Sequence, residues 1–543
     1  MYNMKPLVCL IQVEAQPPAL HDNTADLDRL QLALQNALAD GRSVSIPYRA
    51  MVYVSRGFRG AGFCGWALLN NLEQGWEVVG FFNEKPLNIP AMALDLGTTH
   101  LEASLLNLQT GELMSEGDCE NTQIAFGADI LSRIHHGTTL RRQQKPLPDD
   151  FLDPGLAELQ KTIITAVNEL AEVLVRRAGL EVWEIRALAV SGNTTMAHLF
   201  LGMDPYHLCR EPYIPLFNRA PVISGRDIGL TIHAMAPVWI MPSVGSYFGG
   251  DLISGILASG MAESDKTRML IDVGTNAEVV LGNSEWLIAC AGAAGPALEG
   301  GVARMGMRAG PGAIEYVSID PVSYEVSYRT IGEVAPKGIC GSGLIDLVAA
   351  LYLTRMIDIR GKYRDPDTEK DPLRADFMKK HLVAVDDGFV FVLTGNVESG
   401  ITDQVVLEQV DLDAMIRSKA AMYAILTTLI NQVGLEFDEL EEITVAGAFG
   451  RHIKPQSAMT LGMLPDLPLS TYRAIGNSSL RGAEKVLLDR DARLACEQIV
   501  SSITYLELNV NQEFMIRFSG AHFIPHTDPS FFPSVPSFRE TDK

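Results

Sequence analysis

The sequence predicts an α/β protein in which two similar halves follow a small N-terminal α+β domain. The main observation is a near-repeat: residues 93–100 read ALDLGTTH and residues 270–276 read LIDVGTN. Each stretch is an apolar strand that runs into a polar turn with a glycine, and a second apolar strand follows each turn. The second observation is the length of 543 residues, which exceeds what one hydrophobic core normally supports.

Residues 1–89 are expected to form the small N-terminal α+β domain. An extended segment with Pro17 and Pro18 precedes a helix expected at 24–39, because leucines recur there on one helical face. Residues 84–90 contain two prolines and are expected to link this domain to the next one.

Residues 90–266 are predicted to form the first lobe, residues 267–510 the second lobe and residues 511–543 a loose C-terminal tail. In the first lobe we expect strands at 91–96, 101–108 and 187–190 and helices at 127–136, 156–178 and 196–201. In the second lobe we expect strands at 269–273, 277–281 and 443–445 and helices at 342–353 and 412–433.

The turn that follows Asp95 has the composition of a phosphate-binding loop. Gly97 lets the backbone approach a phosphate with no side chain in the way, and Thr98 and Thr99 can donate hydrogen bonds to phosphate oxygens. Asp95 supplies a carboxylate oxygen, the type of ligand that Mg²⁺ prefers, through water. A hairpin with an ordinary polar turn is the alternative interpretation of this stretch taken alone.

The second stretch repeats these residue types at the same offsets, with Asp272, Gly274, Thr275 and Asn276. Two such loops that face each other would grip a di- or triphosphate from both sides. That arrangement suits transfer or hydrolysis of a γ-phosphate, which depends on metal and oriented donors. The pair therefore predicts a nucleotide site in which Asp95 and Asp272 bind the metal and act in catalysis.

A third turn, rich in glycine, follows the strand at 443–445. Gly447, Ala448 and Gly450 are small, so adenine and ribose would lie flat against the backbone there. A tight connection between a strand and a helix is the alternative for this turn alone. Its position after two phosphate loops favours a nucleoside pocket.

Three further residues are candidates for the same site. Asn193 and Thr194 follow the strand at 187–190, where they either cap a helix or favour an anion at its N-terminus. Glu299 would orient Mg²⁺ or an attacking water, or else it is an acid on a helix surface. His198 is expected to be structural, because no carboxylate lies near it at metal-ligand spacing.

Together, the loops after Asp95 and Asp272 and the turn at 447–450 resemble the superfamily of actin-like ATPases, sugar kinases and heat-shock chaperones. The resemblance implies two duplicated ribonuclease-H-like lobes with ATP and Mg²⁺ in the cleft between them. It also implies that residues 95–99 form the first phosphate loop, that residues 272–276 form the second, and that the turn at 447–450 lines the adenosine pocket.

Several longer stretches are similar to the ATP-dependent reductive activators of corrinoid proteins. They are SGNTTMAH at 191–198, AGPALEG at 294–300, GICGSGL at 338–344, GNSSLRGA at 476–483 and the residues around 511–514 and 523–526. The N-terminal segment also resembles the start of that family's small middle domain. The resemblance covers nearly the whole chain and implies an ATPase that helps to reduce the inactive Co(II) corrinoid of a methyltransferase system to Co(I).

The cysteines depart from the pattern of that family, whose members generally carry an iron–sulfur domain. The seven cysteines of this chain are scattered and fit neither ferredoxin spacing nor a zinc ribbon. We therefore expect no iron–sulfur cluster, a corrinoid protein as partner, and electrons from a separate ferredoxin or flavoprotein. A homodimer that shares one cluster through Cys290 or Cys340, as in the dehydratase activators that this arrangement resembles, is an open alternative.

Two other functions also stay open: a small-molecule kinase on the same fold, and a nucleotide-binding regulatory or remodelling protein without a redox role. The formal charge of −22 argues against nucleic acid as a partner. No apolar run approaches the roughly 20 residues that span a bilayer, and the N-terminus has no secretion signal. We therefore expect a cytoplasmic protein that does not bind membranes.

Overall fold

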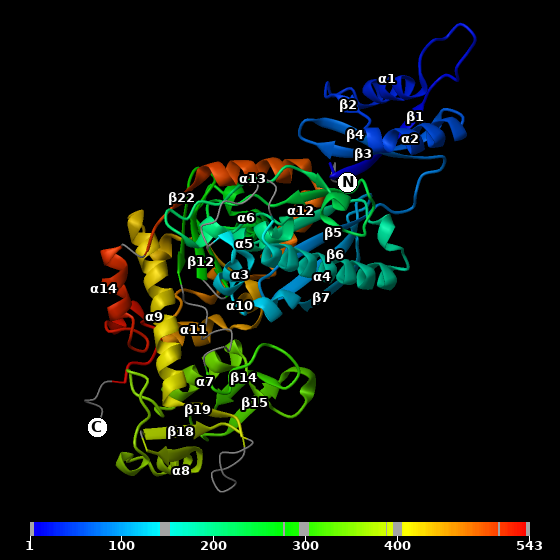
Figure 1. Ribbon diagram of the computed structural model, residues 1–543. Helices are drawn as coiled ribbons and strands as arrows, with labels where there is room; N and C mark the ends of the chain where they lie inside the picture. The colour runs from blue at the N-terminus through cyan, green and yellow to red at the C-terminus, as the bar shows by residue number, and fades with distance from the viewer. Residues whose placement is uncertain are drawn as a thin grey trace. The chain divides into compact units, whose positions relative to one another are not determined.

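The computed structural model contains two units, each built around a six-stranded mixed sheet (Figure 1). It describes residues 5–141, 152–274, 277–292, 303–386, 388–394, 404–508 and 511–538. Unit 1 comprises Met1–Ala258 and Ser478–Ser501, and unit 2 comprises Ser259–Asn477 and Ser502–Lys543. The boundaries at residues 89, 266 and 510 stay predictions from the sequence.

The N-terminal part of unit 1 is a small sheet with two helices against it. The sheet has the order β1-β3-β4-β2 and consists of β1 (Val8–Glu14), β2 (Val44–Ser45), β3 (Cys64–Leu72) and β4 (Gly75–Phe82). Helices α1 (Asp26–Leu38) and α2 (Tyr48–Gly60) pack on it through an apolar core that includes Leu30, Leu34 and Phe58. The α+β character expected of this segment and its first helix are confirmed.

The large sheet of unit 1 has the order β7-β6-β5-β8-β10-β9. Its strands are β5 (Pro90–Leu96), β6 (His100–Asn107), β7 (Leu113–Glu120), β8 (Leu188–Gly192), β9 (Ile223–Ser224) and β10 (Pro237–Ile240). The first three strands form an antiparallel meander, and β8 then pairs in parallel with both β5 and β10. The carboxyl ends of β5, β8 and β10 therefore lie at the same edge.

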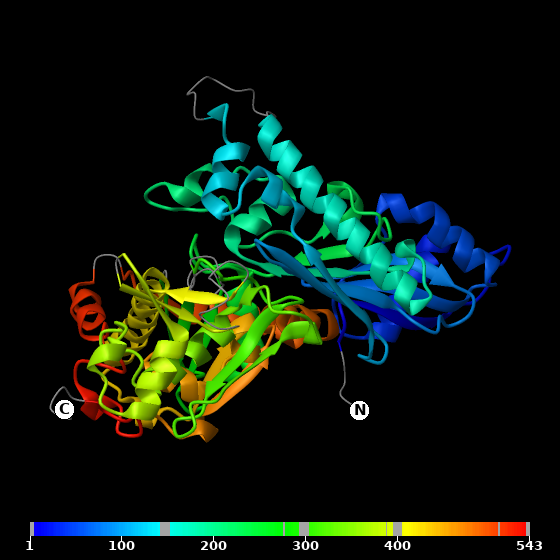
Figure 2. The same cartoon turned by 90° about the horizontal axis from the view of Figure 1, so that it is seen from below.

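Helices α3 (Ile130–Gly137), α4 (Pro154–Ala178) and α5 (Thr194–Leu201) belong to this sheet's layer of helices. Figure 2 shows α4 lying along the sheet, and its apolar side facing the strands includes Ile163, Val167 and Leu170. The helix expected at 127–136 begins later, at Ile130, because Asp129 forms a capping box with Ser132.

Unit 2 repeats this topology in its own sheet, which has the order β21-β20-β11-β12-β13-β22. Its strands are β11 (Arg268–Val273), β12 (Ala277–Gly282), β13 (Leu287–Gly292), β20 (Glu442–Ala446), β21 (Tyr472–Gly476) and β22 (Ile503–Tyr505). Again three strands form an antiparallel meander, and the fourth, β20, is parallel to the first, β11. Five strands have the same order and directions in both units, and this confirms the duplicated α/β fold. The sixth strand differs, because β9 pairs with β10 in unit 1 whereas β22 pairs with β13 in unit 2.

The described residues of unit 2 also form two small sheets and six α-helices. Two small sheets have the orders β15-β14-β16 and β17-β18-β19. Their strands are β14 (Ala313–Ile319), β15 (Val326–Thr330), β16 (Gly338–Ile339), β17 (Leu382–Val385), β18 (Gly388–Val392) and β19 (Val406–Glu408). The helices are α7 (Gly341–Leu353), α8 (Pro372–His381), α9 (Gln409–Gln432), α10 (Gly447–His452), α11 (Pro455–Leu461) and α14 (Gln512–Gly520).

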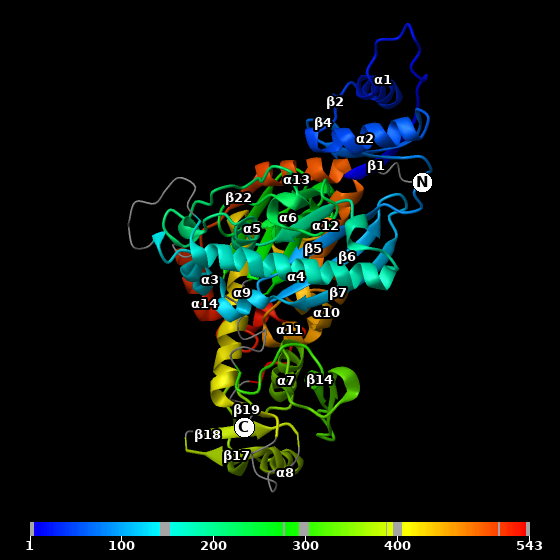
Figure 3. The ribbon, with the colours of Figure 1, turned by 45° about the vertical axis from the view of Figure 1, so that its right-hand side comes forward.

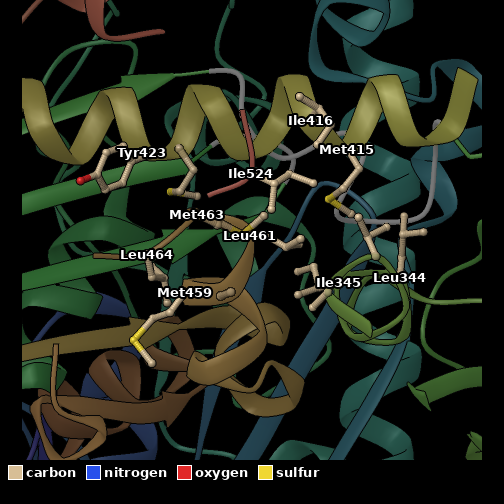
Figure 4. Close-up of a cluster of buried hydrophobic side chains, with 14 of the residues drawn as sticks. Leu344, Ile345, Met415, Ile416, Tyr423, Met459, Leu461, Met463, Leu464 and Ile524 are labelled. Carbon is tan, nitrogen blue, oxygen red and sulfur yellow. The ribbon is translucent and has the colours of Figure 1, made fainter. Parts of the chain in front are cut away.

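The core of unit 2 is organised around α9, which is buried along nearly its whole length. Figure 4 shows Met415 and Tyr423 of α9 in one cluster with Leu461, the last residue of α11, with Met463, which follows α11, and with Ile524 near the C-terminus. Lys419 of α9 is also buried, and its Nζ donates a hydrogen bond of 2.6 Å to the carbonyl of Pro525. The C-terminal segment is thus part of this core, whereas the sequence predicted a loose tail.

Two helices near the C-terminus belong to unit 1 although their sequence lies after most of unit 2. Helix α12 (Ser478–Leu488) packs beside α6 (Gly250–Ser259), and α13 (Arg490–Ser502) follows it (Figures 1 and 3). The approach of α12 to α6 is close: a Cβ on Gly482 would lie 2.4 Å from the Cβ of Ser254. The Nζ of Lys485 donates to the carbonyl of Leu257 at 2.9 Å. These two contacts hold α12 against α6.

Among the described residues, no helix combines the length with the apolar character that crossing a bilayer requires.

The close approach at Gly482 predicts a stability effect. We expect Gly482→Ala to lower the free energy of unfolding by about 1–3 kcal/mol, because the added methyl overpacks the contact with α6. Gly60→Ala in α2 is the matched control: no atom lies within 4 Å of the added methyl, so we expect no loss, or a gain of about 0.5–1 kcal/mol. Urea unfolding of both variants measures the difference, and equal stabilities would contradict the packing described.

Candidate functional site

Asp95 lies at the carboxyl end of β5, beside the end of β8, where it is in register with Ser191. Its side chain is partly buried. The hydroxyl of Ser479, in the first turn of α12, donates a hydrogen bond of 2.6 Å to Asp95 Oδ1. The first predicted metal-binding carboxylate is therefore held at the sheet edge by a residue 384 positions away in the chain.

The turn after Asp95 has room for backbone only. A Cβ on Gly97 would lie 2.3 Å from the carbonyl oxygen of His100, so no other residue fits without moving the turn. Asn121 holds the turn in place: its Nδ2 donates to the carbonyl of Gly97 at 2.9 Å, and its backbone N–H donates to the carbonyl of Thr99 at 3.0 Å. The need for glycine here is steric.

Asn193 joins the next strand end to this turn and also caps a helix. Its Oδ1 accepts from the N–H of Met196 at 3.0 Å, and its Nδ2 donates to the hydroxyl of Thr98 at 3.0 Å. The interpretation of Asn193 as a helix cap is therefore confirmed, and its role toward an anion stays a prediction. The neighbouring Thr194 is 2% exposed, and its hydroxyl donates to the carbonyl of Gly245 at 3.0 Å.

A third strand end contributes a carboxylate that the sequence analysis missed. After β10, a Gly-rich segment leads to Asp251 in the first turn of α6. A Cβ on Gly249 would lie 2.3 Å from the Cα of Asn193 and 2.6 Å from Asp251 Oδ1, so this segment lies directly against Asn193. The signal was present in the sequence as the run Gly249-Gly250-Asp251 after a strand.

His198 is structural, as the sequence predicted. It is fully buried in α5 and stacks on Phe217 with 4.3 Å between ring centroids. Its Nδ1 lies 2.7 Å from the carbonyl of Thr194, and its Nε2 accepts from the N–H of Leu216 at 3.2 Å. Burial lowers the pKa of His198 below its ordinary value. The side chain is therefore a neutral packing and hydrogen-bonding element behind the loop.

In unit 2 the equivalent strand ends bring Asp272 and Gly447 together. Asp272 is the second-last residue of β11 and is in register with Ala446, the last residue of the parallel strand β20. Gly447 has a φ of 76°, and a Cβ there would lie 2.9 Å from Asp272 Oδ1. A Cβ on Gly450 would lie 2.3 Å from the carbonyl of Val445. The turn predicted to hold a nucleoside is thus the tightly wound start of α10 and touches the second predicted carboxylate.

Several predicted site residues are not covered by these observations. Thr275, Asn276 and Glu299 lie outside the described residues, and so does the side chain of Ala448. Gly274 is described and follows β11 directly. The binding roles of these five residues stay predictions.

The cysteine positions bear on the shared-cluster alternative. Cys290 in β13 is 0% exposed and Cys340 is 4% exposed, and burial raises the pKa of the Cys290 thiol. Neither side chain lies at the surface of unit 2, which a cluster shared between two subunits would require. Within the part of the chain that the structure describes, no group of three or more His, Cys, Asp or Glu side chains is placed to hold a metal ion.

Comparison with known families gives consistent matches along the chain. Residues 266–536 match the model described as the C-terminal domain of RACo, the ASKHA domain. Residues 90–264 match the RACo middle region, and residues 1–81 match the RACo linker region. The N-terminal segment, which the resemblance likened to the middle domain, thus matches the linker model.

Individual relatives agree with these models. The corrinoid activation enzyme RamQ of Eubacterium limosum is 33% identical over 460 residues, which cover 83% of this chain and 73% of that protein. The [Co(II) methylated amine-specific corrinoid protein] reductase of Methanosarcina barkeri is 23% identical over 76% of this chain and 72% of that protein.

Among solved structures, a reductive activator for a corrinoid, iron–sulfur protein superposes with a TM-score of 0.84 at 36% identity. The match covers 98% of this chain and 81% of that chain. The chain therefore belongs to the RACo family, the reductive activators of corrinoid proteins.

Proposed function

We propose that this protein binds Mg²⁺ and ATP, hydrolyses the nucleotide, and thereby assists the reduction of a Co(II) corrinoid protein of a methyltransferase system to Co(I). The observation that supports it most is the pair of equivalent strand ends. Asp95 and Asp272 are each the second-last residue of the first strand of a duplicated sheet, and each lies beside a parallel fourth strand. The names of the relatives, a corrinoid activation enzyme and a corrinoid protein reductase, indicate the partner.

The residues present fit a magnesium–nucleotide complex. Asp95 and Asp272 offer carboxylate oxygens, which are the ligands that Mg²⁺ accepts directly or through water. Gly97 and Gly447 keep their turns compact, because a Cβ would meet the carbonyl oxygen of His100 at Gly97 and Asp272 Oδ1 at Gly447. The N-terminus of α5, with Asn193 as its cap, favours a bound anion such as phosphate. Bound ATP would supply the free energy of phosphoryl transfer to water.

The protein's own residues would position the reactants in this scheme. Asn193 fixes the hydroxyl of Thr98, and Asn121 fixes the carbonyls on either side of it, so the loop is ordered before a ligand arrives. Preorganised donors of this kind stabilise developing charge without the cost of reorienting during the reaction. Asp272 and the start of α10 are proposed to bind nucleotide as well, as predicted for the second loop.

The electron is proposed to come from a separate ferredoxin or flavoprotein. Reduction of Co(II) to Co(I) takes one electron, which this donor would lose. The seven cysteines of the chain have neither of the common ferredoxin spacings. The corrinoid protein would then receive the electron while it is bound to the activator.

Replacement of either carboxylate tests the nucleotide site. We expect Asp95→Ala and Asp272→Ala each to lower the rate of ATP hydrolysis by about 100-fold or more, since each removes a metal-positioning oxygen. Asp118→Ala is the matched control, because Asp118 lies on β7 with 67% of its side chain exposed and only a distant contact to His100. Phosphate release is measured with and without a Co(II) corrinoid protein.

The same assay separates the alternatives. Equal rates for the wild type and both aspartate variants would contradict hydrolysis at this site and favour a nucleotide-binding regulatory protein. Phosphate transferred to an added sugar or other hydroxyl compound, in place of free phosphate, would favour a kinase.

The tight turn at Gly97 gives a second test. We expect Gly97→Ala to weaken ATP binding by about tenfold or more, because the methyl would clash with the carbonyl of His100 and push the loop out of place. Isothermal titration calorimetry measures the dissociation constant, and Gly60→Ala, with open space around it, is the control. Unchanged affinity in Gly97→Ala would show that this turn does not bind the nucleotide.

A further inference from the structure

Three serine hydroxyls form a chain of short contacts that ends on Asp95. Ser254 Oγ of α6 lies 2.8 Å from Ser191 Oγ of β8. Ser191 Oγ lies 2.8 Å from Ser479 Oγ of α12, and Ser479 Oγ lies 2.6 Å from Asp95 Oδ1. All these residues belong to unit 1. Three elements from distant parts of the sequence therefore meet at the carboxylate of the first loop.

The chain of hydroxyls is enclosed by protein. Ser191 and Ser254 are 0% exposed and Ser479 is 7% exposed. Gly482, one helical turn after Ser479 on the same face of α12, leaves no space between α12 and α6, and this sets the distance between the two helices. The close packing of α12 on α6 therefore fixes the position of Ser479. A side chain on the protein surface would be held less rigidly.

The last contact of this chain is the one that bears on the loop. Ser479 Oγ donates a hydrogen bond to Asp95 Oδ1. A hydrogen bond that ends on a charged acceptor is shorter and stronger than a neutral one. This bond fixes the position of Asp95 Oδ1, whereas Ser191 and Ser254 lie behind Ser479 in the chain of contacts.

We propose that Ser479 is a positioning residue that holds the Asp95 carboxylate in the orientation that binds the Mg²⁺ of the nucleotide. This inference rests on the proposed function and deepens it. Ser479 acts through Asp95 and makes no direct contact with the nucleotide. Its hydroxyl fixes one carboxylate oxygen, so that binding of the metal does not have to order a rotating side chain.

Removal of the hydroxyl tests the role. We expect Ser479→Ala to weaken ATP binding in the presence of Mg²⁺ by about tenfold, the effect of losing one hydrogen bond to a charged group. Binding measured in EDTA, without Mg²⁺, should change by less than about twofold, because the lost interaction serves the metal. Isothermal titration calorimetry with ATP gives both dissociation constants, independently of turnover.

Ser254→Ala is the matched control. It deletes the same group from the same buried chain but two hydrogen bonds away from Asp95. We expect it to leave the ratio of the two dissociation constants within about twofold of the wild type. Ser479→Cys keeps nearly the side-chain volume but is a weak donor, and we expect it to show the loss seen in Ser479→Ala. The cysteine variant therefore provides the same test if the alanine variant fails to fold.

A double-mutant cycle completes the test. In an Asp95→Ala background, Ser479→Ala should cause no further change in the Mg²⁺-dependent affinity, because its only route to the metal is gone. The inference is overturned if Ser254→Ala has the same effect as Ser479→Ala, or if the loss is as large in EDTA. Failure of the wild type to bind ATP at all, with or without Mg²⁺, would overturn the proposed function and this inference together.

Discussion

The parallel pairing of the first and fourth strands in each sheet is the constraint on which the site depends. In unit 1 this pairing places Asp95 opposite Ser191, and in unit 2 it places Asp272 opposite Ala446. Because parallel strands end at the same edge, the turn after the fourth strand lies beside the aspartate. Asn193 then reaches the loop of unit 1, and Gly447 touches the aspartate of unit 2. The same strand pairing therefore brings a turn next to the aspartate in both units, although the two turns differ in sequence.

The parts of the site that were predictable from the sequence are local ones. The stretches around Asp95 and Asp272 carry both an apolar strand and a polar turn within a few residues, so pattern and composition identify them without a structure. The duplication could be predicted for the same reason. The predicted start of α3 was less accurate than its existence. The capping box at Asp129 sets this helix end more strongly than the apolar pattern does.

Contacts between distant segments were not predictable. Ser479 belongs to the stretch GNSSLRGA at 476–483, which the sequence analysis singled out. The residues around it do not indicate that α12 packs against β5 and β8. The requirement for glycine at position 482 arises from α6, more than 220 residues earlier. Asp251 is a candidate for the site only because β10, the strand before it, pairs with β8. The sequence predicts a loose C-terminal tail because its prolines suppress regular structure. In the structure, however, Ile524 packs in the core around α9, and Pro525 accepts a hydrogen bond from Lys419 of that helix.

The most direct test of the account is the appearance of Co(I). A Co(II) corrinoid protein is mixed anaerobically with this protein and a one-electron donor of the ferredoxin or flavodoxin type, and the cobalt state is followed by absorbance. The account predicts that Co(I) accumulates with Mg²⁺ and ATP, and that it fails to accumulate without ATP or with Asp95→Ala. Equal Co(I) formation in the presence and absence of ATP would contradict the central claim that nucleotide use at these loops supports the reduction.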